Sequence, residues 1–329
     1  MKAGWLPRPV LFFHIPKTAG TSFKNALIPL LGDSKVLRDY GAQSEQTSPL
    51  IRELVYGQRD LYRLGKEIKA QGIDCLVGHF PLRKYIALFG VESVITFSRD
   101  PRVQVLSHYH HWVRKNAYTG SLSEFLRQHC IDGFQTKLFG DIPPETLGAV
   151  CLTERYPDSL RLIAAQHHMV VPQKKLNINP DRPETGSYPV PEGEEEAYAH
   201  AVEADRGLYE RAVVQFERHL QSLDEGRRFV RCLIQQMDSS GVRGLAFVPW
   251  SDDAVRLRLE VNGEAVTELV ANVDRPMLRG IVRTRNAFVG FSFNGANVIR
   301  PGDKVDVLAV DGGQVIASSV LHEKVLQSP

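Results

Sequence analysis

Short apolar runs separated by amphipathic stretches fill the first half of this chain. The apolar residues within each run do not alternate with polar ones, which is typical of parallel strands covered on both faces of a sheet. The runs that predict strands are 10–15, 74–80, 93–98 and 148–153. Between them, apolar residues recur at helical spacing, most clearly at 21–31 and 102–115, and Ser121 with Glu124 predicts a capping box.

A loop and a change of pattern mark the second half. Residues 180–196 hold four prolines, two glycines and an acidic run, which predicts a loop. Helical spacing follows at 197–220 and again at 224–237. After Ser239-Ser240-Gly241, apolar residues recur at every second position, and Asn262-Gly263 predicts a hairpin turn.

These patterns predict two domains. Residues 1–240 predict an α/β domain with a P-loop-like parallel sheet flanked by helices. Residues 241–329 predict a small all-β, sandwich-like domain, in which Asp311-Gly312-Gly313 supplies a second turn. The β domain contains no recognisable catalytic group of residues. It could bind an acceptor glycan, join two copies of the chain or brace the first domain.

Composition narrows the class of protein only slightly. The chain has 329 residues, 43% of them hydrophobic and 24% charged, and a net charge of +2, as is ordinary for a globular protein. So small a charge gives no field for nucleic acid, so we expect no such partner. No apolar stretch approaches the ~18 to 20 residues of a membrane span, and residues 1–5 lack the apolar core of a signal peptide. We therefore expect a cytoplasmic protein with no transmembrane segment.

The cysteines point to buried thiols. Cys75, Cys130, Cys151 and Cys232 are widely separated and form no Cys-x-x-Cys pair. That spacing fits neither a zinc site nor a disulfide framework.

The stretch FFHIPKTAGTSF, at 12–23, joins the first predicted strand to the first predicted helix. Such a loop aims unpaired backbone N–H groups at one point, and a helix start favours an anion. Gly20 would let the backbone approach that anion closely, and Lys17 adds a full charge. The remaining residues of the predicted phosphate loop are Thr18, Ala19, Thr21 and Ser22. It is not a Walker A loop, because its lysine precedes its single glycine.

A second group of polar residues follows the third predicted strand. Arg99 ends that strand, Asp100-Pro101 begins the next helix, and Ser107 lies about two helical turns further on. An arginine at a strand end and a serine on a nearby helix can hold a second phosphate. Taken alone, an Arg-Asp pair at a strand end is often structural.

Together the two stretches resemble the sulfotransferases that use 3′-phosphoadenosine 5′-phosphosulfate (PAPS). The resemblance is to the group with heparan sulfate 2-O-sulfotransferase-like enzymes and their bacterial relatives. HIPKTAGTSF is similar to the family's 5′-phosphosulfate loop, and residues 99–109 to its 3′-phosphate pattern Arg-Asp-Pro-x-x-Arg-x-x-Ser-x-Tyr. Gln104 stands where the family usually has a second arginine, which leaves open whether Arg102 compensates. The segments VGHFPL, GFQTKLFG, LTERYPDSLRLI and KLNINPDRP are also similar, so the resemblance covers about residues 10–220.

The resemblance implies transfer of a sulfuryl group from PAPS to a hydroxyl acceptor, with PAP as the product. Lys17 would stabilise, and could protonate, the oxygen between phosphorus and sulfur, while Arg99 and Ser107 would hold the 3′-phosphate. His79, at a strand end, would be the general base, with an ordinary pKa of roughly 6.5. No metal is expected, because the sulfuryl group carries less charge than a phosphoryl group. The acceptor is expected to be a carbohydrate or glycolipid, and a homo-oligomer is compatible with the sequence.

Four further residues are candidates for substrate contact. His14 precedes the loop, and packing or contact with substrate or nucleotide explains it equally well. Arg83 follows His79 closely, and the candidates Gln135 and Lys137 rest on the resemblance alone. His108, His110 and His111 do not gather on one helix face, which disfavours a metal site there.

Two alternatives to a sulfotransferase remain open. A nucleotide-dependent kinase would also use Lys17, but it needs Mg²⁺ and an acidic Walker-B residue that the sequence does not reveal. A non-catalytic nucleotide- or glycan-binding protein is favoured by Gln104. Lys17 together with His79 argues against it, because binding alone does not need His79.

Overall fold

The structure is a computed structural model that describes residues 9–129, 131–173 and 188–321. Contacts between residues divide the chain into two units. The first contains residues 1–89 and 93–220, and the second contains residues 90–92 and 221–329.

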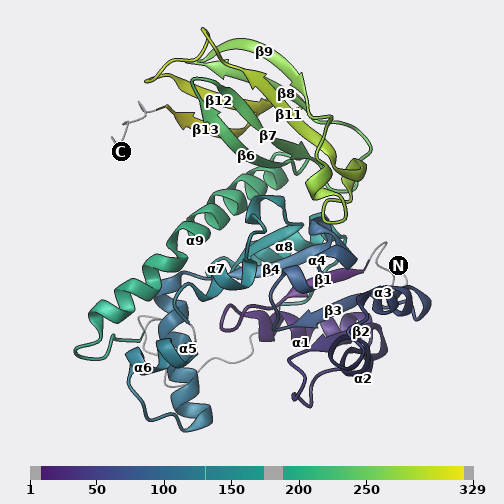
Figure 1. Cartoon of the computed structure of the whole chain (residues 1–329), viewed down its shortest axis with the longest axis vertical. Helices are drawn as coiled ribbons and strands as arrows, with labels where there is room; N and C mark the ends of the chain where they lie inside the picture. Colours follow the sequence, from purple (N-terminus) through teal and green to yellow (C-terminus); the bar gives the residue numbers. More distant parts are fainter. Residues whose placement is uncertain (1–8, 130, 174–187, 322–329) are drawn as a thin grey trace. The chain divides into compact units, whose positions relative to one another are not determined.

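A five-stranded parallel sheet forms the centre of the first unit (Figure 1). Its strand order is β2-β3-β1-β4-β5, and every neighbouring pair is parallel. The strands are β1 (Val10–Phe13), β2 (Val36–Asp39), β3 (Cys75–Gly78), β4 (Val94–Ser98) and β5 (Ala149–Leu152). The predicted parallel sheet flanked by helices is confirmed, and β2 is the strand that the apolar pattern missed.

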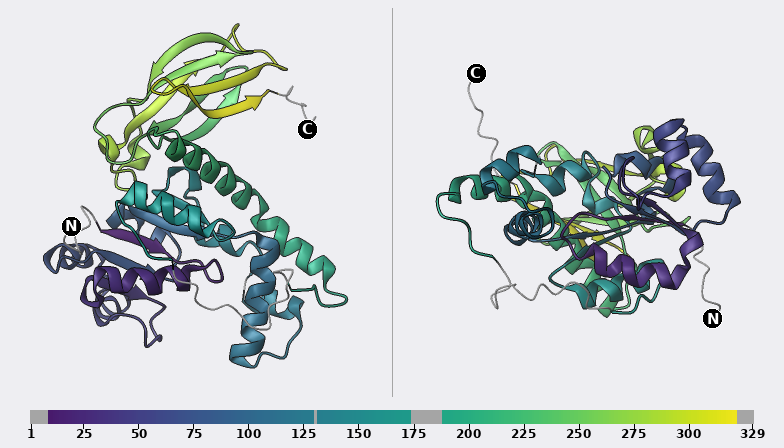
Figure 2. Two further views of the ribbon diagram at one scale, coloured as in Figure 1. Left: turned by 180° about the vertical axis from the view of Figure 1, so that it is seen from behind. Right: turned by 90° about the horizontal axis from the view of Figure 1, so that it is seen from below.

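Helices cover both faces of this sheet, and β1 shows how the faces alternate. Phe12 packs against Phe23 of the first helix, with ring centroids 4.7 Å apart. Phe13 points to the opposite face and contacts Phe139, at 5.4 Å. The first helix and β1 lie side by side, in purple, in both views of Figure 2.

The α-helices are α1 (Gly20–Leu31), α2 (Pro49–Ile51), α3 (Leu61–Ala70), α4 (Arg83–Phe89), α5 (Pro101–Asn116), α6 (Leu122–Gln128), α7 (Phe134–Phe139), α8 (Tyr156–His167) and α9 (Glu195–Asp224).

Shorter helical turns join these elements, and a capping box begins α6. The predicted capping box is present, because the Ser121 side chain accepts from the Glu124 N–H while the Glu124 side chain accepts from the Ser121 N–H. A π-helical turn spans Arg52–Gly57, and 3₁₀ turns span Asp33–Lys35, Val91–Ser93 and Pro144–Thr146.

The strand order places a topological switch point between β1 and β4. The chain leaves β1 through α1 toward β2, on one side of the sheet, and leaves β4 through α5 toward β5, on the other. In open parallel sheets, ligands bind outside the carboxyl ends of the strands at such a point. The loops after β1 and β4 are therefore where a ligand is expected.

A buried carboxylate sits at the same carboxyl edge. Asp39, the last residue of β2, is fully buried and accepts hydrogen bonds from Lys84 Nζ (2.6 Å), Tyr85 OH (2.7 Å) and Tyr56 OH (2.7 Å). Burial alone would raise the pKa of Asp39, but these hydrogen bonds hold it below its ordinary value. Lys84 is therefore engaged with an internal partner.

The backbone of Asp39 also fixes the start of the segment after β3. Its carbonyl oxygen accepts from the His79 N–H at 2.9 Å. Gly78 makes this approach possible, because a Cβ on Gly78 would lie 1.8 Å from the Asp39 oxygen. The position of His79 thus depends on close contact between the ends of β2 and β3.

The second unit consists of two antiparallel four-stranded sheets, with strand orders β10-β11-β7-β6 and β13-β12-β8-β9. Residues of both sheets share one hydrophobic core, which includes Val242, Phe291, Leu257 and Val307. The strands are β6 (Arg231–Asp238), β7 (Gly241–Phe247), β8 (Arg256–Val261), β9 (Glu264–Val270), β10 (Val273–Asp274), β11 (Phe288–Asn294), β12 (Lys304–Ala309) and β13 (Gln314–Val320), with 3₁₀ turns at Pro276–Leu278 and Thr284–Ala287. The predicted all-β, sandwich-like character is confirmed.

Both predicted hairpin turns are present in this unit. Asn262 and Gly263 join β8 to β9 with φ values of 53° and 85°. These positive values are those a two-residue hairpin needs, and Asn-Gly tolerates them best. Gly312 and Gly313, with φ values of 95° and 63°, turn the chain from β12 into β13.

The predicted helix at 224–237 is wrong. Helix α9 ends at Asp224, where Gly226 takes a left-handed φ of 64° and the Arg227 N–H donates back to the Ser222 carbonyl at 2.7 Å. Residues 231–238 then form β6, which pairs with β7 across the turn at Ser239-Ser240. Pairing with β7 outweighs the helical spacing of the apolar residues, and the expected boundary after residue 240 falls within this hairpin.

Other predictions concern segments of which the structure describes only some residues. Cys75, Cys151 and Cys232 are buried free thiols, whereas Cys130 lies outside the described residues. Residues 180–187 of the predicted loop also lie outside them, and α9 begins at Glu195. Among the described residues, no helix combines the length and apolar character needed to cross a membrane.

The Asp39 hydrogen bonds generate a stability prediction. Asp39→Asn leaves the Lys84 ammonium without its buried counter-charge and should lower the free energy of unfolding by about 3 kcal/mol at pH 7. Because the pKa of Asp39 is lowered in the folded state, its contribution is present above roughly pH 4 and is lost as the pH falls through the folded pKa. Urea unfolding at pH 7 and pH 3 should therefore show a difference between wild type and variant that shrinks in acid.

Asp141→Asn is the matched control. Asp141 pairs with Arg83, but both side chains are 61% exposed, so solvent screens the pair and its loss should barely change unfolding. Equal effects of the two substitutions would contradict a special role for Asp39.

Candidate functional site

The loop between β1 and α1 has an unusual backbone. Lys17 and Ala19 both take left-handed conformations, with φ values of 68° and 66°, which non-glycine residues rarely adopt. Between them, Thr18 is buried and its hydroxyl donates to the Ile15 carbonyl at 2.8 Å. The Thr18 proton is thus used inside the loop, not offered to a ligand as the sequence suggested. Backbone strain of this kind is concentrated where proteins hold ligands.

Donors from the β4 side hold this loop in place. Arg99, directly after β4, donates from Nη1 to the Lys17 carbonyl at 2.9 Å. Gln104, on α5, is fully buried and donates from Nε2 to the Pro16 carbonyl at 3.3 Å. The glutamine that replaces the arginine of the resembled pattern therefore braces the loop.

The Gln135 side chain holds the backbone of Arg99 in place through hydrogen bonds. Its Oε1 accepts from the Ser98 hydroxyl (2.9 Å) and from the Arg99 N–H (3.1 Å), and its Nε2 donates to the Arg99 carbonyl (2.8 Å). Asp205 of α9 accepts in turn from the Gln135 N–H at 3.0 Å. Gln135 is fully buried, so its contacts are those of a support for Arg99 and not of a surface facing substrate.

Several cations lie close together around the loop. Burial, followed by the neighbouring Arg99 and Arg114, lowers the pKa of Lys17 to about 8. Burial, Lys17 and then Arg114 likewise lower the pKa of His111 on α5. Every charged neighbour that shifts these two groups is a cation, within the part of the chain that the structure describes. A site of this charge attracts an anion.

Two histidines and a tyrosine lie beside the cationic loop. The His79 ring is edge-on to the rings of His14, at 4.5 Å, and Tyr40, at 4.8 Å. Lys24 of α1 places its Nζ 5.0 Å from the centre of the Tyr40 ring. Residues from the ends of β1, β2 and β3 and from α1 thus meet at one place.

Both imidazoles are neutral at neutral pH. Burial, followed by His79, Lys24 and Lys17, holds the pKa of His14 well below its ordinary value. His79 is an exposed residue, and partial desolvation followed by Lys24 lowers its pKa to about 4. This differs from the ordinary value near 6.5 that the sequence suggested. A neutral imidazole can accept a proton, so the site combines anion attraction with a proton acceptor.

Three other arginine and lysine residues that the sequence pointed to form ion pairs with aspartates. Arg83 pairs with Asp141 at the surface, and Lys137 pairs with Asp132 at 2.8 Å. Arg102 is held by Asp100, with Nη2 2.5 Å from its carboxylate, and is 71% exposed. Arg102 thus lies at the surface and does not share the buried place of Gln104.

The remaining predicted residues lie on the two helices that flank the loops. Thr21 and Ser22 are half-buried in the first turn of α1, and Ser107 is half-buried on α5. His108, on the same helix, packs edge-on against Phe125 and Phe134, at 5.6 and 5.2 Å. Burial and then Lys17 lower the pKa of His108 to about 3, as befits a core side chain.

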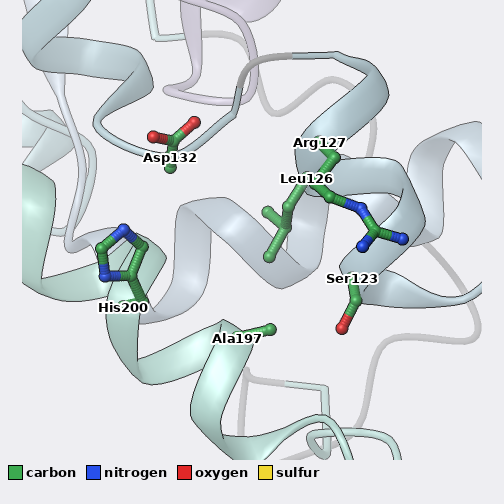
Figure 3. A pocket seen from close by; sticks show the side chains of 6 residues that line it. All are labelled: Ser123, Leu126, Arg127, Asp132, Ala197 and His200. Atoms are coloured by element: carbon green, nitrogen blue, oxygen red, sulfur yellow. The ribbon is translucent and has the colours of Figure 1, made fainter.

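A separate pocket of about 380 Å³ lies between α6 and α9 (Figure 3). Its lining contains none of the predicted site residues, within the described part of the chain. The lining residues are Ser123, Leu126, Arg127, Asp132, Ala197 and His200.

Sequence reasoning missed Tyr40 and Lys24. Tyr40 follows β2, a four-residue strand whose last two residues are charged, so the apolar pattern gave no sign of a strand end there. Lys24 lies in the second turn of α1, seven residues after Lys17, and could have been noticed as a second cation near the loop.

Comparison with known proteins adds little beyond this geometry. The chain matches no protein-family model and no curated protein. A solved sulfotransferase from Alicyclobacillus acidocaldarius aligns with 64% of this chain and 99% of its own, at 19% identity and a TM-score of 0.36. A likeness this distant carries no argument about function, so function has to be argued from the site.

The buried loop predicts an unusual lysine. The Lys17 amine should titrate near pH 8 instead of its ordinary 10.5, because burial and Arg99 disfavour the ammonium form. Titration of ¹³C-labelled lysine side chains by NMR should show one signal with this midpoint, and Lys17→Arg should remove it. A lysine spectrum with every midpoint near 10.5 would contradict this prediction.

Proposed function

We propose that this protein is a sulfotransferase that moves a sulfuryl group from PAPS to a hydroxyl of its acceptor. The observation that carries the proposal is the hydrogen bond from Arg99 to the Lys17 carbonyl, which joins the two cationic segments at the switch point of the sheet. Two segments that each resemble one half of a PAPS site are thus in direct contact. The cations suit a donor with several negative charges, and neutral His79 suits a hydroxyl acceptor.

The donor would be held by two groups of residues. The 5′-phosphosulfate would lie at the start of α1, near Lys17, Thr21 and Ser22, where helix N–H groups point outward. The 3′-phosphate would be bound by Arg99 and Ser107, since a guanidinium suits phosphate geometry. Gln135 and Gln104 would contribute indirectly, by fixing Arg99 and the loop.

The reaction then requires one proton acceptor and one stabilised leaving group. The acceptor oxygen attacks sulfur as its proton passes to His79, and the bond from sulfur to the phosphate oxygen breaks to release PAP. Lys17, with a pKa of about 8 in the free protein, is mostly charged at pH 7 and can stabilise or protonate that departing oxygen. Negative charge brought by the donor should raise the pKa of His79 from about 4, which strengthens this base when the donor is bound.

A non-catalytic nucleotide-binding protein is the second candidate. The low pKa of His79 favours it, because so weak a base accelerates proton transfer little unless a bound anion raises its pKa. A carbohydrate or glycolipid acceptor is proposed on the resemblance alone.

Nucleotide binding tests the donor site. Calorimetric titration should show PAP binding in the micromolar range, much weaker binding of ADP, and at least a tenfold loss for PAP in Arg99→Ala, because a charged hydrogen-bond partner of the phosphate is removed. Arg102→Ala is the matched control, since Arg102 is exposed and paired with Asp100, and it should bind PAP as wild type does. Equal affinity for PAP and ADP would refute the 3′-phosphate site.

The role of His79 separates the enzyme from the binding protein. With PAPS and an acceptor found by screening glycans, His79→Ala should lower the transfer rate by about 10²- to 10⁴-fold while PAP affinity changes little. His200→Ala, in the separate pocket, serves as the control. PAP binding without any transfer in wild type would favour the binding protein.

A further inference from the structure

Gly20, the first residue of α1, lies against the ring of His14. A Cβ on Gly20 would be 1.9 Å from Cδ2 and 2.3 Å from Nε2 of this ring, far inside van der Waals contact. The backbone of Gly20 is helical and has no left-handed φ, so its conformation is open to other residues. The need for glycine at this position therefore comes from the His14 side chain.

The His14 ring has little freedom to move away. It is 4% exposed, and it stacks on Phe12 with centroids 5.5 Å apart and planes within 7°. Its other neighbours are His79, at 4.5 Å, and Tyr40, at 6.4 Å, both edge-on. One ring thus fills the space between the start of α1 and the candidate base.

We propose that His14 is a positioning residue that couples the phosphate loop to His79, and that Gly20 is glycine in order to admit its ring. The catalytic meaning of this coupling rests on the proposed sulfotransferase function. A shift of α1 on nucleotide binding would be passed through the His14 ring to His79. Gly20 would then serve the histidine and not, as its place in the loop suggests, the approach of a phosphate.

The charges around His14 agree with a neutral packing role. The ionisable groups that act on it are His79, Lys24 and Lys17, and all three are cations or potential cations. A protonated His14 would be repelled by each of them. The ring can therefore act through its shape and contacts.

A double-mutant cycle tests the coupling. Gly20→Ala should lower the melting temperature by several degrees and PAP affinity about tenfold, because the new methyl group displaces the His14 ring and the start of α1. In the double variant Gly20→Ala with His14→Ala, the space left by the ring accommodates the methyl group, so PAP affinity should return most of the way and stability should fall no further than in His14→Ala alone. Gly207→Ala, at a helical glycine with open space around it, is the control; it should leave PAP affinity unchanged and should hold or slightly raise the melting temperature.

Transfer kinetics test the positioning role. His14→Ala alone should lower kcat by about 10- to 100-fold with little change in KM for PAPS, because His79 loses its support while the loop still binds the donor. The double variant should bind PAP well and still transfer slowly. A merely structural role would change stability without this split between kcat and KM.

Two outcomes would overturn the inference. If the double variant binds PAP as poorly as Gly20→Ala, the glycine serves the phosphate and not His14. If His14→Ala transfers as fast as wild type, the ring does not position His79. Failure of wild type to bind PAP would instead refute the proposed function, and the stability cycle would still decide whether Gly20 and His14 are coupled.

Discussion

The hydrogen bond from Arg99 to the Lys17 carbonyl is the contact on which the candidate site depends. It joins the ends of β1 and β4, the two strands between which the chain connections diverge. The bond is itself supported by a chain of buried groups, in which Asp205 holds Gln135 and Gln135 holds the backbone of Arg99. A polar network of this kind fixes one geometry, because each member would be left unsatisfied in any other.

The charged groups that shift the pKa values of Lys17, His14 and His79 are lysines, arginines and a histidine. Lys17, Lys24 and Arg99 lie close enough to lower the pKa values of their ionisable neighbours. Grouping cations in this way costs free energy through mutual repulsion, and a polyanionic ligand would lower that cost on binding. The same anion would raise the pKa values of Lys17 and His79, so donor binding and proton transfer are expected to be linked.

Carboxylates at this edge of the sheet have partners of their own, as Asp100 has in Arg102. Asp39 is satisfied by Lys84 and two tyrosine hydroxyls inside the protein, and its backbone positions His79. Two glycines make the arrangement possible, since Gly78 allows Asp39 and Gly20 allows His14 to approach. The site therefore depends on close packing around two histidines as much as on the phosphate loop itself.

The sequence alone determined the features that rest on local signals. Four of the five parallel strands, the capping box at Ser121 and the turn at Asn262-Gly263 follow from patterns within a few residues. Only the tertiary structure decided that Tyr40 and His79 meet, that Gln135 is a buried support, and that 231–238 form a strand. Tyr40 and Gln135 depend on partners far away in the sequence, and 231–238 form a strand because they pair with β7 and pack in the sandwich core. Local patterns cannot specify such partners, because burial and strand pairing are fixed only when the whole sheet assembles.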